Sequence, residues 1–149
     1  MHIVHEKMNA KRYRKLRLVR DKYSFFRRYG AEQADVGIIC WGSSKGPVKE
    51  AVMKANGRGE KVSAFVPQLL YPFPYYEFHE YLKTVSNVIV MELSYSAQFY
   101  KYLRTFLDMP EARTFVFKRS GGRNLTVGEV EDKIQKVLEM SALRREVLV

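Results

Sequence analysis

One stretch decides the fold: Ile38-Ile39-Cys40-Trp41-Gly42-Ser43-Ser44-Lys45-Gly46-Pro47-Val48-Lys49-Glu50-Ala51-Val52. The apolar run over residues 36–41 predicts a buried strand, and the glycine-bracketed residues after it predict a tight loop. Pro47 suits the first turn of a helix, because proline lacks the N–H that would be unpaired there. A strand, a glycine-rich turn and a helix form the opening unit of an open α/β sheet. The loops at the carboxyl ends of such strands gather ligands and partners, so function is expected first at residues 41–46.

The length and composition predict one folded domain. The chain has 149 residues, of which 46% are apolar, which is enough for a core. No apolar run approaches the roughly 20 residues of a membrane span, and residues 1–6 lack the apolar segment of a signal peptide. The single cysteine, Cys40, excludes an internal disulfide and favours a cytoplasmic location. Because Cys40 lies in the predicted strand, we expect a buried structural thiol and not a nucleophile.

The positive charge is concentrated at the N-terminus. Of the net charge of +10, residues 1–30 contribute +8 (ten Lys/Arg, two acids) and residues 31–149 contribute +2 (sixteen Lys/Arg, fourteen acids). Residues 7–29 predict a long helix whose apolar stripe recurs at spacings of three and four: Leu16, Val19, Tyr23 and Phe26. We therefore expect a basic linker helix over residues 1–30 and an α/β domain over residues 31–149.

The basic helix has two interpretations. It could bind nucleic acid or another polyanion, or it could be a solvated or subunit-facing helix. No recognisable nucleic-acid-reading module accompanies it, which makes nucleic acid an unlikely partner.

The rest of the chain alternates strands and helices. Strands are predicted over residues 36–41, 61–66, 87–93 and 113–118, and helices begin at Pro47, at Tyr75, within residues 94–98 and after Thr126. Ser94 or Ser96 is predicted to cap the third of these helices, with Phe99 on its buried face. The helix that starts at Tyr75 is expected to run to Val85. Thr126 and Glu129 have the spacing of a capping box. Four strand–helix units predict parallel strands joined by right-handed crossovers.

The motifs of a self-sufficient active site are not found in the sequence. There is no cysteine cluster and no His/Cys/acid set at metal-ligand spacing. The loop Gly42-Ser43-Ser44-Lys45-Gly46 matches neither the phosphate loop nor the dinucleotide fingerprint, although its backbone could still bind a small anion. Glu92 ends a predicted strand, where it could act as a base, cap the next helix or form an ion pair. We therefore predict no catalytic and no metal-binding residue.

Several segments form a pattern in order and spacing. They are Ala34-Asp35-Val36 through Ile39 with Trp41-Gly42-Ser43, Gly46 and Glu50-Ala51-Val52; Gly59-Glu60-Lys61-Val62; Pro72-Phe73-Pro74; Val88-Ile89-Val90-Met91-Glu92 with Tyr95 and Gln98; and Gly122-Arg123 with Thr126 and Glu129. This pattern resembles the C-terminal, transketolase-like domain of the alpha subunit of 2-oxoacid:ferredoxin oxidoreductases of the 2-oxoglutarate/2-oxoacid type. Residues 5–16 look like the linker helix of that family. Ser94 and Ala97 stand where the family usually has Asn and Gly.

The resemblance implies a three-layer α/β/α fold with a four-stranded, mainly parallel sheet of order 2-1-3-4 and a long N-terminal helix. The loops over residues 41–46 and 92–98 would then face each other across one crevice. The candidate crevice or interface residues are Trp41, Gly42, Ser43, Ser44, Lys45, Gly46, Glu92, Ser94, Tyr95 and Gln98.

The resemblance also implies a role in an oxidoreductase complex that oxidatively decarboxylates a 2-oxoacid to an acyl-CoA and reduces ferredoxin. Thiamine diphosphate, an iron–sulfur cluster and coenzyme A are then expected elsewhere in the complex. The chain itself would be an assembly domain that contacts the other subunits, including the thiamine-diphosphate-binding one, and a homo-oligomer is a further option. Two alternatives remain: a free-standing module that uses helix 7–29 on nucleic acid or another polyanion, and an enzyme that binds a small anion or nucleotide at the crevice.

Overall fold

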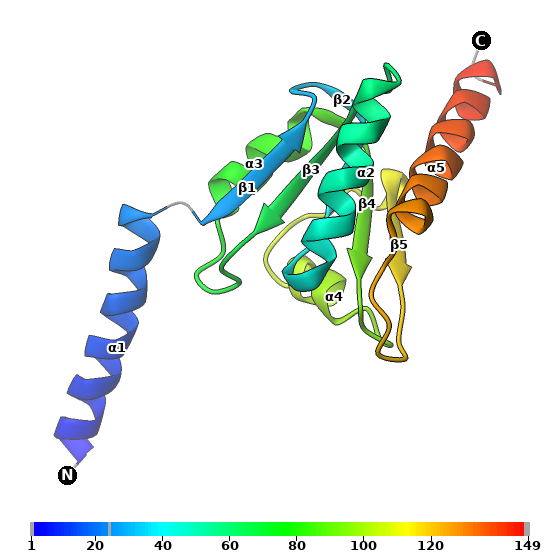
Figure 1. Cartoon of the computed structure of the whole chain (residues 1–149). Helices are drawn as coiled ribbons and strands as arrows, with labels where there is room; N and C mark the ends of the chain where they lie inside the picture. Colours follow the sequence, from blue (N-terminus) through cyan, green and yellow to red (C-terminus); the bar gives the residue numbers. More distant parts are fainter. Residues whose placement is uncertain (1, 24, 148–149) are drawn as a thin grey trace.

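The computed structural model describes residues 2–23 and 25–147 of the chain. Within these residues five strands form a sheet with helices on both faces (Figure 1). The elements are α1 (His2–Lys22), β1 (Phe26–Gly30), β2 (Ala34–Ile39), the 3₁₀ turn η1 (Gly42–Ser44), α2 (Lys45–Gly57), β3 (Val62–Pro67), α3 (Tyr75–Lys83), β4 (Val85–Glu92), α4 (Gln98–Arg104), the 3₁₀ turn η2 (Glu111–Arg113), β5 (Thr114–Lys118) and α5 (Val127–Val147). Among the helices described, none has the length and apolar character needed to cross a membrane.

The sheet has the strand order β1-β3-β2-β4-β5. Strand β2 pairs in parallel with both β3 and β4, and β4 pairs in parallel with β5. The four predicted strands therefore have the expected order 2-1-3-4. The chain first adds β3 on one side of β2 and then crosses to add β4 on the other side. This reversal is the topological switch point of the sheet, where open α/β folds place their ligand crevice.

A fifth strand, β1, corrects the prediction for the N-terminal region. The helix predicted over residues 7–29 ends at Lys22, and Phe26–Gly30 pairs antiparallel with β3. The ring of Phe26 stacks on Phe65 of β3, with centroids 4.8 Å apart. The helical spacing of Phe26 from Tyr23 was accidental, because the partner that defines this strand lies about 40 residues later and leaves no local pattern.

A second, smaller correction concerns the end of α3. Val85 was expected on the apolar face of this helix, but α3 ends at Lys83 and Val85 opens β4. The side chain of Val85 is still buried, so its apolar character is compatible with either element.

The two faces of the sheet have separate cores. One core lies under α2 and α5, and the other lies under α3 and α4 with the Pro-rich turn before α3. The first contains Val36, Ile38, Val48, Val52, Ile89, Val130 and Ile134; the second contains Ile39, Phe65, Phe73, Phe78, Tyr81, Val90, Phe99 and Leu103. Consecutive residues Ile38 and Ile39 of β2 point to opposite cores, which confirms the three-layer α/β/α architecture.

The start of α5 confirms the predicted capping box. The Glu129 N–H donates to Thr126 Oγ1 at 3.2 Å, and the Thr126 N–H donates to Glu129 Oε2 at 2.8 Å. The guanidinium of Arg119, which follows β5, also donates to Glu129 Oε2 at 2.9 Å. Chiefly because of the Arg119 bonds, the pKa of Glu129 is lowered to about 2 from an ordinary value of 4.5.

The lowered pKa of Glu129 predicts a specific loss of stability in acid. Folding favours the charged carboxylate, so its stabilising contribution is present above about pH 4.5 and is lost as the pH falls towards 2. In urea unfolding at a series of pH values, Glu129→Gln should have a lower free energy of unfolding than the parent at neutral pH. This difference between the two proteins should disappear as the pH falls from about 4.5 to about 2. Glu139→Gln, an exposed change on the same helix, should keep a constant offset from the parent. A Glu129→Gln offset that does not vary with pH would contradict the prediction.

Candidate functional site

A depression of about 300 Å³ lies at the carboxyl ends of β2 and β4, at the switch point of the sheet. It is lined by Trp41, Gly42, Ser43, Ser44, Glu92, Leu93, Ser94, Gln98 and Phe99. Seven of the ten predicted crevice residues thus meet at one place, and the loops after β2 and β4 form its two walls. Lys45, Gly46 and Tyr95 are not among the lining residues.

The first wall is the short turn between β2 and α2. Trp41 is extended at this point, with φ −143°, and its side chain is 44% exposed. The indole ring lies 6.0 Å from the ring of Phe99, measured between centroids, so the two aromatic groups bridge the walls. Ser44 is buried under the turn. Trp41 therefore packs one part of its ring near Phe99 and leaves a large apolar surface exposed to a partner.

The second wall is held by the buried carboxylate of Glu92. One oxygen, Oε2, accepts hydrogen bonds from the Ser94 hydroxyl at 2.5 Å and the Phe99 N–H at 2.9 Å. The other, Oε1, accepts from the Tyr100 N–H at 3.0 Å. Of the three roles considered for Glu92, the geometry matches the cap of the next helix. Both oxygens hold the loop, so Glu92 acts as a structural clamp.

Ser94 completes this clamp. Its hydroxyl oxygen accepts a hydrogen bond from the Gln98 N–H at 3.0 Å while the hydroxyl donates to Glu92. Three successive N–H groups at the start of α4, those of residues 98–100, are therefore satisfied by two side chains from the preceding loop. The sequence predicted Ser94 or Ser96 as the cap, and Ser94 is the one seen in this role.

The residue before α4, Ala97, has a left-handed backbone conformation with φ 55° and ψ 50°. A side chain with a Cβ is strained there, whereas glycine is not. We expect Ala97→Gly to raise the free energy of unfolding by about 0.5–1 kcal/mol, as measured by urea denaturation. The same change at Ala142, exposed within α5, should lower it by about 0.5–1 kcal/mol. A loss of stability in both variants would contradict the strain at Ala97.

Tyr95 lies beyond the rim of the depression, on the side of β5. Its side chain is 82% exposed, and the Lys118 ammonium group lies 5.6 Å from the centroid of its ring. The candidate site is therefore a surface with two exposed aromatic groups, Trp41 in the turn after β2 and Tyr95 in the loop after β4 that the Glu92 clamp holds. Lys45 opens α2 and is half-buried, and the neighbouring Gly46 is exposed.

Two lining residues were not among the predicted site residues. Phe99 was predicted only as part of the buried face of α4, and Leu93 only as the end of a strand. Nothing in their local sequence distinguishes them from other core residues, because their place at the depression depends on β2 and β4 being neighbours.

The described residues do not match the ligand set of a metal or iron–sulfur centre. No group of three or more His, Cys, Asp or Glu side chains among them could hold a metal ion. Burial raises the pKa of the Cys40 thiol to about 12, so this group stays protonated at neutral pH and is a poor ligand.

Comparison with known proteins identifies the domain type. The family model described as pyruvate:ferredoxin oxidoreductase core domain II matches residues 34–130. The alpha subunit of 2-oxoacid:ferredoxin oxidoreductase 2 from Aeropyrum pernix is 28% identical over 140 residues, which are 92% of this chain and 22% of that protein. The 2-oxoacid:ferredoxin oxidoreductase subunit alpha from Saccharolobus solfataricus is 30% identical over 143 residues, with coverage of 93% and 22%.

Solved structures agree with this assignment. A 2-oxoglutarate:ferredoxin oxidoreductase from Magnetococcus marinus, with 2-oxoglutarate, coenzyme A and succinyl-CoA bound, superposes with a TM-score of 0.80 at 32% identity. The superposition covers 89% of this chain and 23% of that one. A split-gene transketolase shares the fold, with a TM-score of 0.54 at 19% identity over 76% of this chain and 41% of that one.

The chain spans about a fifth of the length of the curated relatives described above. The family match covers residues 34–130, well over half of the 149 residues, and confirms the resemblance seen in the sequence. The chain belongs to the pyruvate:ferredoxin oxidoreductase core domain II family.

Proposed function

We propose that the chain is an assembly domain of a 2-oxoacid:ferredoxin oxidoreductase. In that reaction a 2-oxoacid loses carbon dioxide, its acyl group forms a thioester with coenzyme A, and the electrons pass to ferredoxin. The single observation that carries the proposal is the family match over residues 34–130, a range that contains all ten candidate site residues.

The proposed role of the candidate site is to contact a neighbouring subunit. Two features support it. Trp41 and Tyr95 are exposed aromatic side chains, the type that is enriched at the energetic centres of interfaces. The carboxylate at the same place is occupied by its own loop, so the depression has a defined shape without a free acid or base from Glu92. We therefore expect the ten candidate residues to shape the border of a neighbour's active site.

The remaining expectations follow from this role. Thiamine diphosphate, an iron–sulfur cluster and coenzyme A would be bound by other domains or subunits, and ferredoxin would dock on the complex. The location would be the cytoplasm. Residues 1–30 would serve as a linker helix between the α/β domain and the rest of the complex, with β1 now counted as part of the sheet.

Reconstitution tests the proposal. The chain would be co-expressed with the other segments and subunits of a 2-oxoacid:ferredoxin oxidoreductase, and assembly would be measured by size-exclusion chromatography and by 2-oxoacid- and CoA-dependent reduction of ferredoxin. The double variant Trp41→Ala/Tyr95→Ala should weaken assembly about tenfold or more at a temperature where thermal unfolding shows that the isolated variant chain is still folded.

Met53→Ala/Leu143→Ala provides the matched control, because these two apolar side chains are 57% and 61% exposed but lie on α2 and α5 and do not line the candidate site. It should assemble like the parent. Equal assembly by the parent and the double variant would refute the proposed interface, and the absence of any assembly would refute the proposed function.

A further inference from the structure

The N-terminal helix α1 projects from the α/β body, and none of its residues is buried (Figure 1). It has 21 residues, which corresponds to a length of about 30 Å. Helices in water gain most of their stability from packing one side against another element. In the described structure most of α1 lacks such a partner, so the helix offers a long surface to be covered.

This surface is strongly basic. Residues 2–22 contain eight Lys/Arg and two acids, a balance of +6. Within the described side chains, α1 forms one ion pair, between Arg20 and Asp21 at 3.2 Å. Six carboxylates of the α/β body already form ion pairs with Lys or Arg side chains of the body: Glu50, Glu60, Glu80, Glu111, Glu129 and Glu131. Most of the positive charge of α1 therefore forms no ion pair within the described side chains and is available to an acidic partner.

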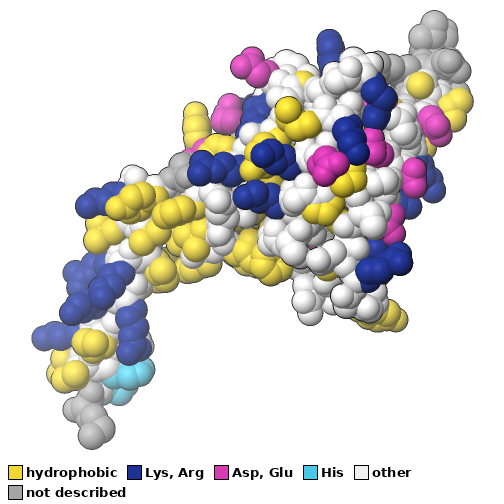
Figure 2. Space-filling model, viewed as in Figure 1, with side chains coloured by type: hydrophobic (Ala, Val, Ile, Leu, Met, Phe, Trp, Pro, Cys, Tyr) yellow, Lys and Arg dark blue, Asp and Glu magenta, His cyan; other side chains and the backbone are white. Residues whose placement is uncertain are grey.

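Apolar side chains are interspersed with these charges. The exposed ones are Ile3, Val4, Met8, Tyr13, Leu16 and Leu18. Figure 2 shows hydrophobic side chains next to Lys and Arg side chains along this helix. A phosphate backbone could neutralise the bases but would leave these apolar groups in water. A protein surface with both acidic and aliphatic side chains could cover both kinds.

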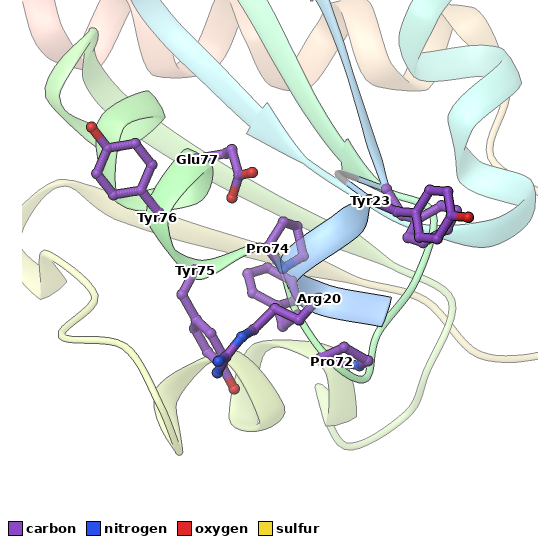
Figure 3. Close-up of a pocket in the computed structure, with 9 residues that line it drawn as sticks. Arg20, Tyr23, Pro72, Pro74, Tyr75, Tyr76 and Glu77 are labelled. Atoms are coloured by element: carbon purple, nitrogen blue, oxygen red, sulfur yellow. The ribbon is translucent and has the colours of Figure 1, made fainter. Parts of the chain in front are cut away.

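The apolar surface continues from α1 onto the body. Leu16 and Arg20 face Tyr71, Tyr75 and Phe106 across a hollow of about 220 Å³. A second hollow, of about 240 Å³, is lined by Arg20, Tyr23 and the Pro-rich turn before α3. Arg20 lies beside Tyr75 in this second hollow, between helix and body (Figure 3). The helix and the aromatic turn thus form one mixed basic and apolar surface.

We propose that this surface, made by α1, residues 71–76 and Phe106, docks a partner protein chain that presents acidic and aliphatic side chains. This docking surface rests on the proposed function in one respect: the other subunits or domains of an oxidoreductase complex would supply the partner. A second copy of this chain fits poorly, because two helices of charge +6 repel each other.

A defined probe tests the chemistry of the surface. It is a synthetic helix of about four heptads with Leu at positions a and d and Glu at the exposed positions. Binding to the full chain would be measured by fluorescence anisotropy at about 0.15 M salt, where weak surface electrostatics are screened. Backbone hydrogen exchange would report on residues 2–22. We expect binding at least tenfold tighter than that of poly-L-glutamate, of the same helix with Lys in place of Glu, or of a duplex DNA of about 20 base pairs, with slowed exchange in α1.

Variants localise the binding. Arg12→Glu/Lys15→Glu and Leu16→Ser/Leu18→Ser should each weaken binding about tenfold or more, and neither should change the melting temperature, because α1 buries no residue. Lys101→Glu/Lys136→Glu removes the same charge at exposed positions of the body and should leave the affinity within about twofold.

Four results would overturn the inference: DNA binding as tight as that of the acidic helix, equal binding of poly-L-glutamate, protection of α1 by self-association, or no binding. Failure of the oxidoreductase to assemble, with intact binding of the probe, would refute the proposed function alone. An assembled enzyme in which α1 exchanges as freely as in the isolated chain would refute the docking surface alone.

Discussion

Replacing Glu92 with alanine should lower the free energy of unfolding by about 3–5 kcal/mol, although the residue lies at the carboxyl end of β4 and not in the middle of the strand. The change leaves the N–H groups of Phe99 and Tyr100 and the hydroxyl of Ser94 without their acceptor. Each buried polar group that loses its partner costs about 1–3 kcal/mol. The loop between β4 and α4 should also open, so that hydrogen exchange over residues 93–100 becomes faster than in the parent.

Glu92→Gln separates charge from shape. It keeps the size of the side chain, but its amide group turns two donors towards N–H groups that are themselves donors. We expect a loss of about 1–3 kcal/mol, between the parent and the alanine variant, measured by urea denaturation. Glu80→Ala is the control, since this exposed carboxylate pairs with Lys83 at 2.7 Å on the surface of α3 and should cost under about 0.5 kcal/mol. If Glu92→Ala stayed within the range of that control, the carboxylate would not be the clamp of this loop.

The second large effect is expected for Gly30→Ala, at the end of β1. Gly30 has φ +83°, and a Cβ added to it would lie 2.2 Å from the carbonyl oxygen of Val62 and 2.6 Å from Cγ1 of Val52. The Val62 oxygen cannot move freely, because it accepts hydrogen bonds from the Ala31 N–H at 3.0 Å and from Asn56 Nδ2 at 2.7 Å. Backbone strain of about 1–2 kcal/mol and displacement of this oxygen should together cost about 3–5 kcal/mol.

Gly59→Ala is a matched control for the strain. Gly59 has φ +85°, almost the same as Gly30, but an added Cβ would meet nothing within 4 Å. Its loss should be about 1–2 kcal/mol, the strain alone. The difference between the two variants in thermal and urea unfolding measures the close approach of β1 to β3 and α2. Equal losses at both positions would show that Gly30 is needed only for its backbone angle.

Much of the fold could be predicted from the sequence, because it is written in local patterns. The apolar runs of β2, β3 and β4 match interior strands, and Thr126 with Glu129 marks the start of α5 before any tertiary contact is known. The clamp role of Glu92 was one of three open alternatives, since the sequence places an acid before a helix but cannot show which N–H groups it meets.

Other features depended on tertiary structure. Phe26 and its neighbours join the sheet only through β3, and the antiparallel pairing leaves no signal within residues 26–30 themselves. Phe99 and Trp41 approach to 6.0 Å because β2 and β4 are neighbours, although the two residues lie far apart in the chain.

The sequence by itself determined the four parallel strands and most of the helices that follow them, because hydrophobic periodicity and capping act over a few residues. The family resemblance in the sequence added the three-layer architecture, the type of domain and seven of the nine residues that line the depression at the switch point. Only the tertiary structure decided that the basic helix stops at Lys22, that β1 completes the sheet and that α1 remains uncovered. These features depend on contacts between segments that are distant in the chain. The free energy of such contacts cannot be predicted from the local sequence pattern of either segment.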